Sequence, residues 1–480
     1  MDKTRRYGLI IGLVLFIIPL VTAPPAGMSD QAWRTAGIAL LLAAWWATEV
    51  LPIPVTSLLP LLLFPALGIM SMAQSAAPFA RPTIFLLLGG FIIATALARW
   101  NLHRRLALTI LVRVGNRPAA LIGGFMAATA LISMWISNTA STIMMIPIAL
   151  SLAGEIVQGR GDGKYRGFVL CLVLGIAYAA SIGGLGTPIG TPPNLFVVSF
   201  MKDSYGIEIS FLTWMMFGLP TVFILVPIAW LVLTKWAFPF ALPDAPEAHM
   251  RLAAELDALG PMTRPERRVA LVFLLVALAW IFRLPVQKNL DIFLWLNDAM
   301  IAVGGATLLF IIPSGCQKEK ATALLDWETA NHIPWGVLLL FGGGLSLAAG
   351  VKMSGLALWL GTSLAALGTL PLIIMVLALV TMVIFLTELT SNTATVATLL
   401  PVLGALAAST GIAPMMLFAP VALSASCAFM LPVATAPNAV IYSTGEVTIP
   451  EMAGAGFRLN LVAIIAVTAL SYALVPVIFG

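Results

Sequence analysis

Two short clusters of hydroxyl and amide side chains interrupt long apolar runs of this chain. The first is Ser137-Asn138-Thr139, inside an apolar run from about residue 119 to 153, and the second is Ser391-Asn392-Thr393. If these runs lie in a membrane, lipid tails solvate neither hydroxyl nor amide groups, so such side chains need protein, ion or ligand partners. Because the cluster occurs twice, it indicates a site made of two parts.

A stretch rich in glycine and proline follows each cluster. The first runs from Gly183 to Asn194, and its counterpart is Ala434-Thr435-Ala436-Pro437-Asn438. Prolines remove N–H donors and glycines permit unwound backbone, so carbonyl oxygens are left free to bind a cation. A helix that restarts at such a break presents free N–H groups and the positive end of its dipole, which bind anions.

The types of side chain in the two clusters favour sodium as the cation. Hydroxyl, amide and carbonyl oxygens suit this ion, and no Lys, Arg or His lies inside either cluster. An anionic substrate would therefore be held by hydroxyls, amides, helix N-termini and bound cations. The empty site then contains no unpaired buried charge, and binding of the cation and of the anion would be coupled.

The composition is that of a membrane protein. Of the 480 residues, 60% are hydrophobic and 9% are charged, and the mean hydropathy is +1.03, whereas soluble domains carry about 25% charged residues. The apolar runs are near the length of a helical span and lack the alternation of a barrel. We therefore predict an all-α polytopic membrane protein of the plasma membrane, and no role in nucleic-acid binding.

The same signals recur in order along the chain, which indicates two repeats. Leu88-Gly89-Gly90 is matched by Phe341-Gly342-Gly343, and the polar cluster and the break follow in each half. We divide the chain into an N-terminal transmembrane helix, a first repeat, a cytoplasmic proline-rich linker and a second repeat, over residues 1–30, 31–237, 238–266 and 267–480. Pro24 and Pro25 directly after a possible cleavage site favour a retained first helix over a signal peptide.

Each polar cluster is expected at the tip of a re-entrant hairpin. The runs 118–153 and 370–408 are too long for one span and have polar centres. If these hairpins do not cross the membrane, each repeat has an odd number of spans, so the second repeat is inverted. With a cytoplasmic N-terminus, most of the 25 Lys and Arg residues then lie on the inner side.

The paired clusters and breaks resemble those of the divalent-anion/sodium symporter family, which includes sodium-coupled dicarboxylate and citrate transporters. The resemblance extends from Trp45-Trp46-Ala47-Thr48-Glu49 to the second break. It implies about eleven transmembrane helices plus two hairpins, a homodimer in membrane lipid, and elevator-type movement of a transport domain against a scaffold. Transported sodium would be the only cofactor, with no organic group.

The resemblance also implies roles for individual residues. One sodium site would use Ser133, Ser137, Asn138 and Gly190, and its mirror would use Thr387, Ser391, Asn392 and Ala434. The substrate carboxylates would meet eight residues, four from each half: Ser137, Asn138, Thr139, Thr191, Ser391, Asn392, Thr393 and Thr435.

The resulting expectation is sodium-coupled import of C4-dicarboxylates such as succinate, malate and fumarate. A sodium-independent dicarboxylate exchanger, or a symporter for citrate or sulfate, is the alternative within the family. Ala436, where the family often has proline, leaves the substrate size preference open. A channel is a further alternative, which saturable and coupled flux would exclude.

An embedded enzyme is disfavoured, because the motifs offer neither acidic metal ligands nor a nucleophile with a base. Glu388, three residues before Ser391, has two readings: a proton or cation partner, or a structural carboxylate bonded behind the tip. The histidines are scattered, and the three cysteines are far apart, so neither a metal cluster nor a disulfide framework is expected.

Overall fold

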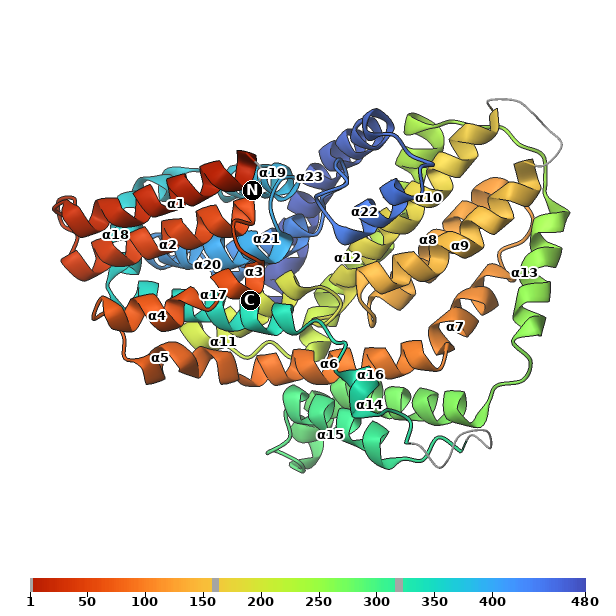
Figure 1. Ribbon diagram of the computed structural model, residues 1–480, viewed down its shortest axis with the longest axis horizontal. Helices are drawn as coiled ribbons and strands as arrows, with labels where there is room; N and C mark the ends of the chain where they lie inside the picture. The colour runs from red at the N-terminus through yellow and green to blue at the C-terminus, as the bar shows by residue number, and fades with distance from the viewer. Residues whose placement is uncertain (1–2, 158–163, 316–322) are drawn as a thin grey trace.

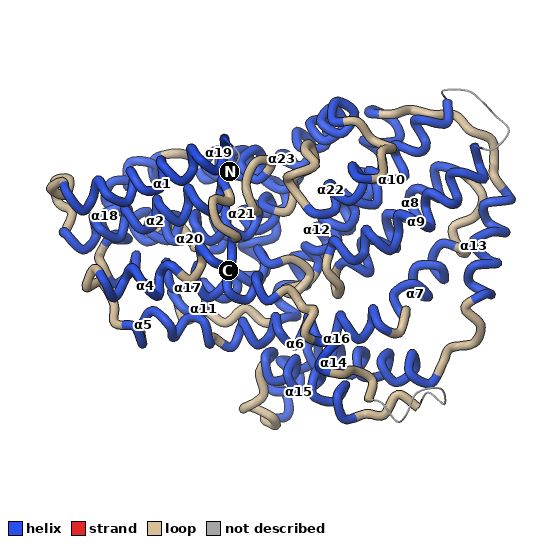
Figure 2. The backbone as a smooth tube through the Cα atoms, viewed as in Figure 1, coloured by secondary structure: helices blue, strands red, loops and turns tan. Residues whose placement is uncertain are grey.

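The computed structural model describes residues 3–157, 164–315 and 323–480, and these residues form a bundle of helices (Figures 1 and 2). Eight of the described helices are long and apolar enough to cross a membrane. Six further apolar helices have 10–17 residues, and several are pieces of interrupted runs. The class of all-α polytopic membrane protein is confirmed, and the total of about eleven crossing helices stays a prediction.

The helices of the first half and of the connecting segment lie in this order: α1 (Lys3–Val21), α2 (Asp30–Thr48), α3 (Ile53–Thr56), α4 (Leu59–Ala66), α5 (Met72–Ala76), α6 (Pro82–Arg99), α7 (Leu102–Leu111), α8 (Pro118–Ser133), α9 (Asn138–Val157), α10 (Lys164–Gly183), α11 (Pro192–Tyr205), α12 (Phe211–Leu231) and α13 (Pro246–Ala258). The second half follows: α14 (Arg264–Leu290), α15 (Asp298–Ile311), α16 (Trp327–Ala330), α17 (Trp335–Met353), α18 (Leu356–Leu364), α19 (Leu372–Thr387), α20 (Asn392–Thr410), α21 (Met415–Ala425), α22 (Ala436–Ser443) and α23 (Ile449–Phe479).

Both long runs with polar centres form helical hairpins. In the first, α8 and α9 pack against each other and are joined by the tip around Ser137, and Figure 1 shows them side by side. In the second, α19 and α20 are joined around Ser391, which is the N-cap residue of α20. Each tip lies directly before the second helix of its hairpin, because Ser and Asn favour the N-terminus of a helix over its interior.

The two glycine- and proline-rich stretches interrupt helices at equivalent places. After α10 the chain makes one 3₁₀ turn at Gly184–Gly186 and a second turn in which the Gly190 N–H donates to the Thr187 carbonyl, and Pro192 then begins α11. After α21 it runs to Thr435, with α22 beginning at Ala436. Thr191 and Thr435 share one extended conformation, with φ of −144° and −140°. Proline in the first turn of each new helix fixes φ without removing a needed donor.

The helices that carry the breaks lie deepest in the molecule. Every residue of α21 is buried, and α10 is buried over nearly its whole length. In the order of elements, α6, α7, the first hairpin and α10–α12 are matched by α17, α18, the second hairpin and α21–α23. A close-packed interior has low compressibility, so the breaks are carried by helices that are held tightly on all sides.

The proline-rich segment between the halves contains α13 and is tied to both neighbours. Arg105 on α7 donates to Glu266 Oε1 at 3.1 Å and to the Gly260 carbonyl at 2.9 Å. Glu266 also caps the start of α14 through the backbone N–H of Thr263, at 2.6 Å. The amphipathic helix α7 and the start of α14 are therefore held together by one ion pair.

Candidate functional site

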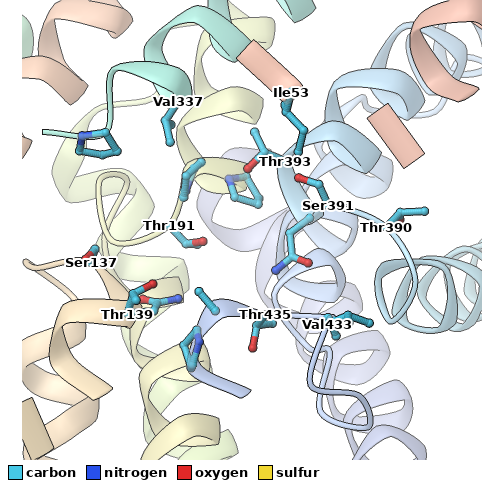
Figure 3. A pocket seen from close by; sticks show the side chains of 18 of the residues that line it. Ile53, Ser137, Thr139, Thr191, Val337, Thr390, Ser391, Thr393, Val433 and Thr435 are labelled. Atoms are coloured by element: carbon cyan, nitrogen blue, oxygen red, sulfur yellow. The ribbon is translucent and has the colours of Figure 1, made fainter. Parts of the chain in front are cut away.

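Both hairpin tips and both breaks line one cavity of about 910 Å³ (Figure 3). The structure brings together all eight side chains expected to meet the anion: Ser137, Asn138, Thr139, Thr191, Ser391, Asn392, Thr393 and Thr435. Figure 3 shows Ser137 and Thr139 on one side of this space and Ser391 and Thr393 on the other. A cavity of this size accommodates a small organic anion with its ions.

Of the remaining expected sodium ligands, Gly190 and Ala434 also line the cavity. Ser133 and Thr387 do not; both are fully buried behind the tips. The hydroxyl of Thr387 donates to the Ile384 carbonyl of its own helix at 3.1 Å. The two expected sodium sets are thus each split between the cavity wall and the layer behind it.

The amide of Asn138 is fixed from behind. Its Oδ1 lies 2.6 Å from Ser133 Oγ, which is also 2.8 Å from the Ala180 carbonyl oxygen of α10. Gly184 permits this arrangement, since a Cβ there would lie 2.8 Å from Asn138 Oδ1. The first tip, α10 and the first break therefore meet at one polar point, and the oxygens of Asn138 and Ser133 are both suited to a hard cation.

An asparagine pins each break in the same way. Asn194 Nδ2 donates to the carbonyls of Gly184 at 2.9 Å and Thr187 at 2.8 Å. In the other half, Asn438 Nδ2 donates to the carbonyls of Ala428 and Leu431, both at 3.1 Å. Both asparagines belong to the sequence motifs, but their bonds to the loop carbonyls depend on the folded shape of each break and are not encoded in the motif itself.

Three buried amide oxygens at the tips and breaks have no hydrogen-bond partner among the residues that the structure describes: those of Asn194, Asn392 and Asn438. Buried polar atoms are nearly always satisfied, so these oxygens are free to accept from a water molecule or to contact an ion or a ligand. Neutral amide oxygens accept a cation without requiring a fixed charge in the empty site. Among the described residues, no group of three His, Cys, Asp or Glu side chains could hold a metal.

The structure favours the structural reading of Glu388. Its Oε1 accepts from the N–H of Phe429 at 2.8 Å and from Asn460 Nδ2 at 2.7 Å, and its Oε2 accepts from the N–H of Leu431 at 3.2 Å. Both oxygens also accept from the Met430 N–H at 3.0 Å. The side chain is buried behind the second tip. The carboxylate thus ties α19 to the chain before the second break.

The first half makes the corresponding connection without a charge. Thr187 Oγ1 donates to the Met134 carbonyl at 2.6 Å and accepts from the Gly190 N–H at 3.0 Å. One hydroxyl therefore joins the first tip to the first break. The two halves reach the same contact between tip and break by different chemistry.

The cavity wall also contains Arg5, Glu49 and His332, which lie outside the motifs. Close packing of α1 on α2 brings Arg5 there: a Cβ on Gly8 would lie 2.1 Å from Thr48 Oγ1. Glu49 ends α2 with a left-handed φ of 47°. The clusters themselves remain free of basic residues, but basic side chains do reach the cavity from two other segments.

Cys171 and Cys427 are buried free thiols, as expected from their separation, and Cys316 lies outside the described residues. Both side chains are fully buried, and neither lines the cavity. The thiols therefore contribute packing rather than ligands to the site.

Comparisons with known proteins agree with this architecture. The model of the "Sodium:sulfate symporter transmembrane region" family matches residues 3–478. The sodium-dependent dicarboxylate transporter SdcS of Staphylococcus aureus strain USA300 is 42% identical over 477 residues, covering 98% of this chain and 92% of that protein. SdcS of Staphylococcus saprophyticus is also 42% identical, over 478 residues, with the same coverage. The crystal structure of the YdaH transporter of Alcanivorax borkumensis has a TM-score of 0.57 at 17% identity, covering 98% of both chains, and supports the fold alone.

Proposed function

The chain belongs to the divalent-anion/sodium symporter family, and we propose that it imports C4-dicarboxylates such as succinate, malate and fumarate together with sodium. The family consists of membrane transporters rather than enzymes. The single observation that carries the proposal is the cavity in which Ser-Asn-Thr from one tip faces Ser-Asn-Thr from the other. Two separated polar ends suit an anion with a carboxylate at each end.

The oxygen atoms of the cavity wall support sodium as the transported cation. The first site would use Ser133, Ser137, Asn138 and Gly190, and the second Thr387, Ser391, Asn392 and Ala434. Unpartnered amide oxygens at the tips and breaks support cation binding there. Since no basic residue lies in either tip, bound sodium would neutralise the substrate carboxylates, and removal of sodium would leave the anion without its counter-charge.

The repeated order of elements supports a transporter of two inverted repeats, residues 31–237 and 267–480, after an N-terminal helix over residues 1–30. Residues 238–266 would lie in the cytoplasm with the N-terminus. The hairpins, α10–α12 and α21–α23 would move as one body against the other helices in a homodimeric elevator, within the plasma membrane. Such rigid-body motion carries a fixed site between the two faces.

Uptake by proteoliposomes tests the proposal. We expect an inward sodium gradient to drive uptake of labelled succinate, with strong competition from malate and fumarate and weak competition from citrate and sulfate. Preloading with succinate in choline medium separates symport from exchange, because rapid sodium-independent counterflow would contradict the proposal. Strong competition by sulfate would instead favour the sulfate transport for which the family model is named.

A further inference from the structure

A second cavity, of about 580 Å³, lies between α11, α17, α18 and α20. Its walls are mainly small and apolar residues, among them Ala348, Gly361, Gly404 and Ala405, with Lys352 also lining it. At one side Tyr205 Oη donates to the Gly404 carbonyl at 3.1 Å, which joins α11 to α20. In Figure 1 these helices gather in the half of the molecule away from α13.

Two helices connect this cavity with the anion cavity. Val337 of α17 and Thr393 of α20 line the anion cavity, whereas Val351 of α17 and Ala405 of α20 line the second one. At 1.5 Å per residue, the two cavities are separated by about 20 Å along each helix. The second cavity therefore lies toward the opposite end of the helices that form the anion cavity.

The charge at this cavity indicates the chemistry of its ligand. Lys352 is exposed, and within the described part of the chain it has no ion-pair partner. Leu358, which also lines the cavity, is 76% exposed on α18, so the opening lies beside a surface that lipid would cover. An apolar chamber with an unpaired ammonium group at its edge is complementary to an amphiphile with an anionic head.

We propose that this cavity binds an anionic phospholipid, with one acyl chain inside and the phosphate on Lys352. Ala408 and Ala357 line the chamber and would contact the chain. The phospholipid is the occupant favoured by the position of the opening, since the surrounding membrane supplies chain and headgroup together.

The lipid would also influence transport. It contacts α20, which begins at the second tip, and it contacts α17 and α18, which the proposed elevator leaves in the scaffold. A ligand that binds between two bodies in one arrangement stabilises that arrangement. Phospholipid would therefore hold α20 against α17 and slow turnover. This second part rests on the proposed function, but the binding site does not.

Native mass spectrometry of the full-length purified protein, titrated with dioleoyl phosphatidylglycerol or dioleoyl phosphatidylcholine, tests the site. We expect wild type to retain one phosphatidylglycerol at least five times more strongly than phosphatidylcholine. Lys352→Gln should remove this preference, and Ala408→Phe should remove binding by filling the chamber. The matched controls are Lys288→Gln and Ala366→Phe, which alter an exposed lysine and an exposed alanine that do not line the cavity.

Equal retention of the two lipids by wild type, or an unchanged preference in Lys352→Gln, would overturn the headgroup assignment. Undiminished phosphatidylglycerol binding by Ala408→Phe would overturn the chamber as the site, and its melting temperature shows whether that variant is folded. Absence of any lipid, as expected if a neighbouring copy covers the cavity, would also overturn the proposal. Loss of lipid binding together with faster succinate uptake would support both the site and its effect on turnover. Loss of lipid binding with unchanged uptake would support the site and contradict the effect on turnover.

Discussion

The asparagines at the two tips are equivalent in sequence but held differently in the structure. Asn138 Oδ1 lies 2.6 Å from Ser133 Oγ, whereas Asn392 Oδ1 is buried and has no partner within the described part of the chain. The Asn138 amide is therefore oriented by the protein itself, whereas the Asn392 oxygen is left free for a water molecule, an ion or a ligand. This difference gives the two proposed sodium sites different degrees of preorganisation.

Asn138→Ala and Asn392→Ala should each abolish sodium-driven succinate uptake, because each removes an amide that both the ion and the anion would share. We expect a loss of at least about 100-fold, equivalent to about 2.7 kcal/mol. Asn289→Ala is the matched control, since this exposed amide lies away from the cavity and donates to the Pro285 carbonyl of its own helix. Full uptake by either tip variant, measured in proteoliposomes, would contradict the site assignment.

Arg5 lines the cavity and the neighbouring Arg6 does not, which provides a matched pair. A positive side chain at the wall raises the local concentration of a dianion and speeds its encounter. With the N-terminus in the cytoplasm, as proposed, Arg5→Gln should therefore raise the half-saturating internal succinate concentration for efflux about two- to fivefold, with less effect at high ionic strength. Arg6→Gln should leave this concentration unchanged. Equal behaviour of the two variants would exclude a role for Arg5 in substrate access.

At the scale of elements, the breaks differ at one matched position. A Cβ on Gly190 would lie 2.5 Å from the Gly184 carbonyl oxygen, whereas Ala434 carries a Cβ at the corresponding place in the second break. Gly190→Ala should therefore distort the first break, at a cost of about 1–3 kcal/mol, and abolish uptake. Ala434→Gly should keep uptake within about twofold. Unimpaired transport by Gly190→Ala would show that the loop tolerates displacement.

The Glu388 carboxylate joins the second tip to residues 429–431, so its removal should affect the whole second half. Glu388→Ala leaves three backbone N–H groups without an acceptor, each at a cost of about 1–3 kcal/mol. We expect this variant to have a lower melting temperature and no uptake. Glu388→Gln should lower the melting temperature less, and the control Glu328→Gln, at an exposed position, should not lower it. A stable Glu388→Ala protein with altered sodium dependence would instead favour the ion-partner reading.

Local patterns predicted the hairpins and the breaks, because a polar centre in an overlong apolar run and a glycine- and proline-rich interruption are encoded within one segment. They did not predict Arg5 or His332 in the cavity wall, since α1 and the segment before α17 reach the cavity only through packing. The role of Glu388 stayed open for the same reason: its partners lie about forty residues later in the chain. The second cavity, of about 580 Å³, was not predicted from the sequence, because the small residues that line it are those of ordinary contacts between membrane helices.

At the scale of the whole molecule, the two halves complete one site. Each contributes a tip and a break, and the helices that carry the breaks are buried in the interior. On the proposed function, an anion held this way would need cations from solution, since the tips carry no basic side chain. In that proposal the residues that bind both solutes would couple them without a further conformational switch, and by linkage each solute would strengthen binding of the other.

Equilibrium binding of succinate to the purified protein, measured by calorimetry in sodium chloride and in choline chloride of equal ionic strength, tests this account most directly. We predict that sodium tightens succinate binding at least tenfold and that succinate tightens sodium binding by the same factor. Equal succinate affinity in the two salts would contradict the central claim that the anion is bound through its sodium ions.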